Sequence, residues 1–196
     1  MSSNTVIHQI VRPVVRAIAP TKVTPNQITT LRLITAIASA VCYAKAGALW
    51  LGVGGLVFVL SMLLDRADGE LARQTGQSSP GGHVYDLICD CIAGVAGFIG
   101  IGIGLIPVWG SIAVWLGVSA GLGIGVMFWQ LNVWKLVELK PWRFGRFDVD
   151  PDDLMILVPI LIWLGQIKPM LVAASLITPA IALWLSLAAL MKQRAP

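Results

Sequence analysis

The chain has 196 residues, of which 57% are hydrophobic and only 12% are charged. Soluble domains carry about 25% charged residues, so this composition leaves too little polar surface for a protein dissolved in water. The net charge of +4 does not indicate nucleic-acid binding, because the basic residues lie at the ends of apolar segments rather than along one stripe. We therefore expect an integral membrane protein, with no nucleic-acid partner, that forms a single domain over residues 1–196.

The first predicted element is an amphipathic helix over residues 5–18. Apolar residues recur in it at helical spacing: Ile7, Ile10, Val11, Val14 and Ile18. Arg12 and Arg16 lie between them, a pattern typical of a helix in the membrane interface. Pro13 removes a backbone donor, so a disordered tail is the alternative. We predict that residues 1–25 form an interfacial helix and a linker.

Six further segments approach the roughly 20 apolar residues that a helix needs to cross a bilayer core. They are residues 27–46, 49–72, 82–106, 109–135, 152–167 and 169–191. The expected fold is therefore all-α, with six transmembrane helices bundled over residues 26–191. No secretory signal is expected, because the first long apolar segment begins only after Asn26 and does not end in a small-residue cleavage site.

Charge asymmetry predicts the orientation of these helices. With the N-terminus in the cytoplasm, only Lys45 and Lys168 of the 14 basic residues fall outside, as expected when basic residues collect in cytoplasmic loops. All 10 acidic residues then lie at the cytoplasmic end. We expect a protein of the bacterial inner membrane whose chemistry takes place at the cytoplasmic surface.

Glycines recur in the third and fourth of these segments, where they allow helices to approach closely in lipid. They are Gly97, Gly100, Gly102, Gly104, Gly117, Gly121, Gly123 and Gly125. The pattern suits either packing within one chain or contact between two chains. A homodimer is the expected assembly.

Four aspartates carry the strongest functional signal. Asp65 and Asp68 share one helix face, as do Asp86 and Asp90. The short polar loop 74–81 makes the two helices antiparallel neighbours, so the four carboxylates should converge on one cleft. Such a cluster needs cations to offset its charge, and oxygen ligands favour magnesium, manganese or calcium over zinc. His83 is expected to be a bystander, off the Asp86 and Asp90 face.

Residues between the aspartates suggest a pyrophosphate site. Gly69 and Gly82 remove side chains where a phosphate must approach closely, and Arg73 offers a fork of donors that matches phosphate. Close helix packing is the alternative for the glycines. For Arg73 the alternative is a cation that extends to the membrane interface.

The full pattern is Asp65-x2-Asp68-Gly69-x2-Ala72-Arg73-x8-Gly82-x3-Asp86-x3-Asp90. It resembles the signature of the CDP-alcohol phosphotransferase family, also called CDP-alcohol phosphatidyltransferases, and every signature position is present. This family also has six transmembrane helices behind an amphipathic helix, with a cytoplasmic active site.

The resemblance implies a role for each of these positions. Asp65, Asp68 and Asp86 would be ligands of magnesium or manganese, and Asp90 would be both a ligand of a second ion and the general base. The CDP group would be bordered by Gly69, Ala72, Arg73 and Gly82. Ser79 and the stretch from Thr24 to Thr29, including Asn26, Ile28 and Thr29, resemble further nucleotide contacts.

The implied reaction belongs to phospholipid biosynthesis. Asp90 takes a proton from an acceptor alcohol, the alcohol oxygen attacks the phosphorus attached to the donor alcohol, and CMP leaves. The donor is either CDP-diacylglycerol or a CDP-polyol, and the motif leaves the choice open. An ion or proton transporter is the alternative function, since transporters also bury carboxylates. In the predicted topology, this chain has no acidic residue at mid-membrane depth, which disfavours a transport path.

The loop from Lys135 to Asp153 bears on the acceptor. It carries more acidic than basic residues near the start of the fifth segment: Asp148, Asp150, Asp152 and Asp153 against Arg143 and Arg146. Coulomb repulsion then disfavours an anionic sugar phosphate and favours a neutral polyol, an amino alcohol or a lipid hydroxyl. The alternative is that Asp152 and Asp153 cap a helix while the basic residues fold inward to form a phosphate pocket.

Overall fold

The computed structural model describes residues 6–137, 142–144, 147–149 and 151–194. Five long helices dominate the described part of the chain: α2 (Pro25–Lys45), α3 (Gly47–Thr75), α4 (Pro80–Gly104), α6 (Ile112–Asn132) and α8 (Ile167–Arg194). The shorter elements are α1 (Val6–Ile18), α5 (Ile106–Trp109), β1 (Trp142–Phe144), β2 (Phe147–Val149), the 3-10 helix η1 (Pro151–Ile156) and α7 (Leu157–Trp163).

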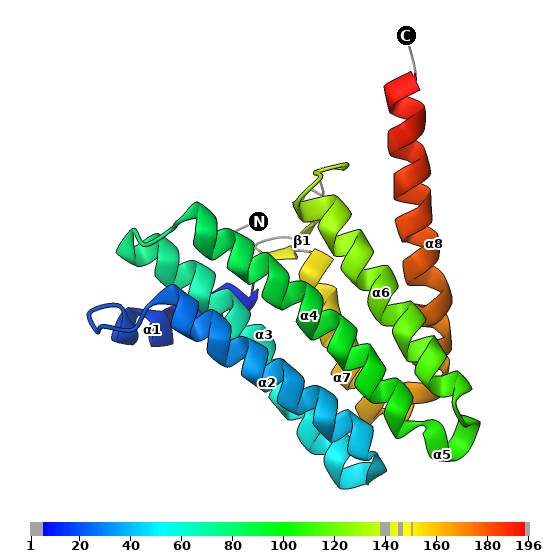
Figure 1. Cartoon of the computed structure of the whole chain (residues 1–196). Helices are drawn as coiled ribbons and strands as arrows, with labels where there is room; N and C mark the ends of the chain where they lie inside the picture. The colour runs from blue at the N-terminus through cyan, green and yellow to red at the C-terminus, as the bar shows by residue number, and fades with distance from the viewer. Residues whose placement is uncertain (1–5, 138–141, 145–146, 150, 195–196) are drawn as a thin grey trace.

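These long helices form a row in which each packs on its neighbour (Figure 1). Helix α2 contacts both α3 and α4, α4 contacts α6, and α6 contacts α8. The beginnings of α2 and α4 and the end of α3 lie at one end of the row, beside α1 (Figure 1). Residues that are distant in sequence are therefore brought together at this end.

The boundaries of α2, α3 and α4 follow from local chemistry. Thr24 caps α2 through a reciprocal pair of hydrogen bonds with Gln27, and Pro25 occupies the first helical turn. Helix α3 ends at Gly76, whose φ of +69° is accessible to glycine without strain. Ser79 then caps α4 by accepting a hydrogen bond from the Gly82 backbone N–H at 3.0 Å. These caps make the tight turn that sets α3 and α4 antiparallel.

Five helices in the described residues are long and apolar enough to cross a membrane: α2, α3, α4, α6 and residues 167–191 of α8. The fifth predicted segment differs, because η1 and α7 together rise only roughly 22 Å, less than the roughly 30 Å of a bilayer core. The prediction of an all-α integral membrane protein is confirmed, and the count of six spans stays a prediction.

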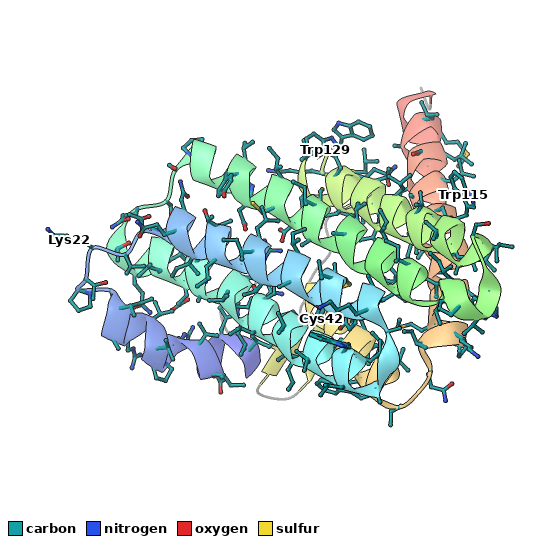
Figure 2. The ribbon with its side chains drawn as sticks, turned by 60° about the horizontal axis from the view of Figure 1, so that its bottom comes forward. Lys22, Cys42, Trp115 and Trp129 are labelled. Carbon is teal, nitrogen blue, oxygen red and sulfur yellow. The ribbon has the colours of Figure 1, made fainter. Side chains whose placement is uncertain are left out.

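The outer surface of the row is apolar, as expected for a lipid-facing surface. Trp115 and Trp129 on α6 are 70% and 39% exposed, and Figure 2 shows Trp129 extending away from the bundle. Lys22, by contrast, lies in the turn between α1 and α2 (Figure 2).

A small hairpin of two three-residue strands accompanies the helices. β1 and β2 pair antiparallel, with Trp142 opposite Val149 and Phe144 opposite Phe147. Apolar and polar residues alternate in both strands, and period-two alternation is typical of β-structure. The loop prediction for residues 135–153 missed this alternation.

Helix α1 confirms the predicted amphipathic helix, and its apolar residues divide into two sets. Val11 and Val15 are buried in a cluster with Ile28, Ala67 and Leu71. Ile10 and Val14 are 59% and 61% exposed on another side of the helix. One set therefore fixes α1 to the bundle, and the other is available to the membrane interface.

Most of the glycines allow close contacts within the chain. A Cβ on Gly100 or Gly104 would overlap the α2 carbonyls of Ala40 and Tyr43. A Cβ on Gly117 would lie 2.5 Å from the Phe98 carbonyl oxygen on α4. These glycines give no support to the predicted homodimer, because packing inside one chain already explains them.

Candidate active site

A cavity of about 290 Å³ opens where the helix ends meet. Helices α2, α3 and α4 all contribute to its wall, together with the turn between α3 and α4. The lining residues are Pro25, Asn26, Thr29, Asp68, Gly69, Ala72, Arg73, Gln77, Ser78, Ser79, Gly82, His83 and Asp86. The cavity thus collects polar side chains at one end of an apolar bundle.

Three of the four predicted aspartates form a tight group. Asp65, Asp86 and Asp90 each offer a carboxylate oxygen, and these oxygens lie within 4.8 Å of one another. Asp86 also lines the cavity, so the group adjoins it. Three converging oxygen donors suit a hard divalent cation.

Asp68 is held differently from the other three. Its side chain is buried and accepts a hydrogen bond from the Thr29 hydroxyl at 2.7 Å. It faces the same cavity as Asp86. Of the four aspartates, Asp68 and Asp86 line the cavity, and Asp86 also belongs to the three-carboxylate group with Asp65 and Asp90.

Arg32 is the main member of the site that the sequence analysis missed. Its guanidinium lies 3.2 Å from Asp65 and 3.3 Å from Asp86, and it also forms an ion pair with Asp90. Arg32 was predicted only to be one of the basic residues on the cytoplasmic side. Its position seven residues after Pro25, inside an apolar helix, was the available signal.

A second buried ion pair connects the site to the hairpin region. Arg66 donates to Asp153 at 2.9 Å and lies 3.7 Å from Asp65. Asp153 was predicted either to repel an anionic acceptor or to cap a helix, and instead it is paired with Arg66. One carboxylate fewer is then available to repel an anionic acceptor. The side chains of residues 138–152 lie outside the described part.

Arg73 is oriented by its own helix. It donates to Glu70 at 3.0 Å, while its side chain remains 46% exposed beside the cavity. Glu70 is also 3.4 Å from Arg12 of α1 and accepts from Gln74 at 2.9 Å. The buried Glu70 carboxylate therefore connects α1 with a cation at the cavity wall.

Residues 22–191 match the family model described as CDP-alcohol phosphatidyltransferase. This chain belongs to that family.

Curated relatives with two different names match this chain. Cholinephosphotransferase 1 of Gallus gallus is 33% identical over 137 residues, which cover 70% of this chain and 39% of the relative. Phosphatidylinositol phosphate synthase of Mycobacterium tuberculosis (strain ATCC 25618 / H37Rv) is 31% identical over 93 residues, 47% of this chain and 42% of the relative. In both cases the chain aligns with less than half of the relative's length.

Solved structures of the M. tuberculosis phosphatidylinositol phosphate synthase share the fold of this chain. The structure with CDP-DAG bound has a TM-score of 0.66 at 19% identity and covers 94% of this chain and 92% of that chain. The structure with manganese and citrate has a TM-score of 0.65 at 19% identity, with 93% and 87% covered.

The cavity brings together nearly all the residues predicted to contact the nucleotide. Gly69, Ala72, Arg73, Ser79, Gly82, Asn26 and Thr29 all line it. Ile28 does not, because its side chain faces α1 and packs on Val11 and Val15. Gln77 and Ser78 line the cavity without having been predicted.

His83 was predicted to lie off the face of Asp86 and Asp90, and that position was wrong, while its role as a bystander stays a prediction. His83 lies three residues before Asp86 in the first turns of α4, so the two side chains share a face and both line the cavity. It is not part of the three-carboxylate group.

Replacing Gly69 tests ligand binding separately from the stability of the fold. A Cβ there would meet no described atom closer than the Arg73 guanidinium at 3.6 Å, so the fold itself has room for alanine. We expect Gly69→Ala to unfold at the same or a higher temperature, because glycine inside a helix costs roughly 0.5–1 kcal/mol relative to alanine. The methyl group would project toward the cavity and raise the KM for a CDP-alcohol by roughly tenfold.

Thermal unfolding and steady-state kinetics on the same preparation would measure both effects. Gly52→Ala on α3 is the matched control, because a Cβ there meets no described atom within 4 Å and the residue does not line the cavity. It should leave KM unchanged. An unchanged KM in Gly69→Ala would show that the ligand does not bind against the Gly69 side of the cavity.

Proposed function

We propose that this chain transfers a substituted phosphate group from a CDP-alcohol to an acceptor hydroxyl, with release of CMP, in phospholipid biosynthesis. The observation that carries the proposal is the juxtaposition of a three-carboxylate group with a polar cavity lined by the glycines and arginine of the motif. Membership in the CDP-alcohol phosphatidyltransferase family supports the reaction class.

The cavity suits the pyrophosphate of the donor. The N-termini of α2 and α4 both reach it, through Pro25 and Asn26 on one side and Ser79 and Gly82 on the other. The positive dipole ends of helices favour phosphate oxygens. Arg73 adds a cation at the wall. A relative was solved with CDP-DAG bound, which supports a CDP-alcohol as the donor.

The carboxylate group suits magnesium or manganese. Asp65, Asp86 and Asp90 would hold the metal through their converging oxygens, and Asp68 would add a further ligand from the cavity wall. We propose two ions, which when bound would stabilise charge on the attacking and leaving oxygens. A relative was solved with manganese and citrate, which supports this choice of metal.

Asp90 is the proposed general base. Its carboxylate accepts the proton of the acceptor hydroxyl while the oxygen forms a bond to the phosphorus of the donor alcohol's phosphate. The bond between that phosphorus and the bridging oxygen breaks, and CMP carries the bridging oxygen away. Arg73 balances negative charge on the pyrophosphate during this step.

We propose the cytoplasmic side of a bacterial inner membrane as the location of the site, because the predicted charge distribution places the basic and acidic residues at that end. A single domain over residues 1–196, a six-span topology and a homodimer remain part of the proposal.

The acceptor is proposed to be a neutral alcohol rather than a sugar phosphate. In the sequence near the start of the fifth predicted segment, Asp148, Asp150 and Asp152 outnumber Arg143 and Arg146, so a dianionic acceptor would meet Coulomb repulsion there. We expect glycerol 3-phosphate and inositol phosphate to be poor substrates and weak inhibitors beside neutral alcohols. Competition assays measure this, and saturable turnover of a sugar phosphate with inert neutral alcohols would contradict it.

The reaction class is tested with the purified protein. CDP-diacylglycerol and soluble CDP-alcohols would each be offered with a panel of acceptors and manganese, and CMP and the second product would be followed by mass spectrometry. CMP released in equal amounts with a new phosphodiester is the expected result. If a folded protein that binds a CDP-alcohol released no CMP with any pair of donor and acceptor, that result would contradict the proposal.

A further inference from the structure

Arg32 stands at the centre of the carboxylate group. Its side chain is 8% exposed, and each of the three guanidinium nitrogens faces a different aspartate. Nε is 3.2 Å from Asp65 Oδ1, Nη1 is 3.3 Å from Asp86 Oδ1, and Nη2 pairs with Asp90 Oδ1. These three aspartates are the ones whose oxygens lie within 4.8 Å of one another.

The backbone of Arg32 is fixed as well as its side chain. The buried Ser61 of α3 donates to the Arg32 carbonyl at 3.1 Å, and Thr35 donates to the same carbonyl at 2.7 Å. Helix α2 packs against both α3, which carries Asp65, and α4, which carries Asp86 and Asp90. The guanidinium is thus placed by the helix packing and is not a surface cation reaching for solvent.

Charge favours a specific use for this arrangement. Three carboxylates and one guanidinium leave two negative charges, which one divalent ion offsets. Without Arg32, the group would carry three negative charges in a site largely shielded from water, at a high cost in free energy. With a metal bound, the guanidinium would lie within a few ångströms of a second cation that binds the same carboxylates.

We propose that Arg32 is a resident counter-cation and positioning residue that competes with metal for Asp65, Asp86 and Asp90. It holds the carboxylates together when no metal is bound, and it weakens metal binding so that the ion exchanges. This inference rests on the metal site of the proposed function.

The test compares Arg32→Gln and Arg32→Lys with the wild-type protein in detergent. Binding of Mn²⁺ is followed by electron paramagnetic resonance, and thermal unfolding is measured in EDTA and in excess Mn²⁺. We expect Arg32→Gln to bind Mn²⁺ at least about tenfold more tightly, because a like charge a few ångströms from the ion is removed. In EDTA it should unfold at a lower temperature than the wild type, and Mn²⁺ should restore most of the difference.

Arg32→Lys keeps the charge and should bind Mn²⁺ within a few-fold of the wild type. Arg16→Gln removes an exposed charge from α1 and should leave both measurements unchanged. If Arg32→Gln folds only with Mn²⁺ present, that rescue also supports the proposal.

Two results would contradict the role proposed for Arg32, and a third would contradict the metal site itself. Unchanged or weaker Mn²⁺ binding in Arg32→Gln, or an equal loss of stability with and without Mn²⁺, would assign Arg32 a purely structural role and overturn the proposal. Failure of the wild-type protein to bind Mn²⁺ at all would instead refute the metal site of the proposed function.

Discussion

Replacing Asp90 with asparagine is expected to lower the rate of CMP release by about 10² to 10⁴, the usual contribution of a proton-transfer group. Asparagine has nearly the same shape as aspartate but cannot accept the proton of the acceptor hydroxyl. The other three aspartates remain, and the cavity lined by Asp68 and Asp86 is unaltered, so CDP-alcohol binding should persist. Single-turnover CMP release and calorimetric binding of the donor would measure the two quantities separately.

Two controls make the Asp90→Asn result interpretable. Asp90 pairs with Arg32, so thermal unfolding must show that the variant is folded. Asp153→Asn changes a buried carboxylate that pairs with Arg66 outside the three-carboxylate group, and it should retain far more turnover. A normal rate of CMP release from Asp90→Asn would show that the base has been assigned to the wrong residue.

Removal of divalent metal is expected to abolish turnover, and added magnesium or manganese should restore it. The carboxylate group and the pyrophosphate of the donor are all negative, and Arg32 and Arg73 alone cannot offset them. The measurement is CMP release after dialysis against a chelator. Chelator already saturated with manganese is the matched control and should not inhibit.

Asp65→Ala tests the same site through the protein. Asp65 is one of three converging oxygen donors, so its loss should weaken metal binding. Turnover should then be severely lowered at metal concentrations that give the wild type full activity. Excess manganese should recover part of the activity. Full activity of this variant in ordinary buffer, or of the wild type without metal, would defeat the metal-site proposal.

The positions of the helices and much of the cavity were predictable because they depend on local properties. A run of apolar residues long enough for a bilayer predicts a helix whatever its neighbours are. The spacing of Asp86 and Asp90 places both on one face of α4, as found. Gly69, Ala72, Arg73, Ser79 and Gly82 reach the cavity because the turn between α3 and α4 is short.

The expectations that failed concerned pairs of residues on different elements. The sequence shows that Arg32 follows Ile28 by one helical turn, but not that α2 turns Ile28 toward α1 and Arg32 toward three aspartates. In the same way Asp153 pairs with Arg66, a residue far away in sequence. Lipid solvates every apolar helix face alike, so hydrophobicity does not select the rotation or register of one helix against another. Close contacts such as Gly100 against the Ala40 carbonyl select them, and only the tertiary structure shows which side chains then meet.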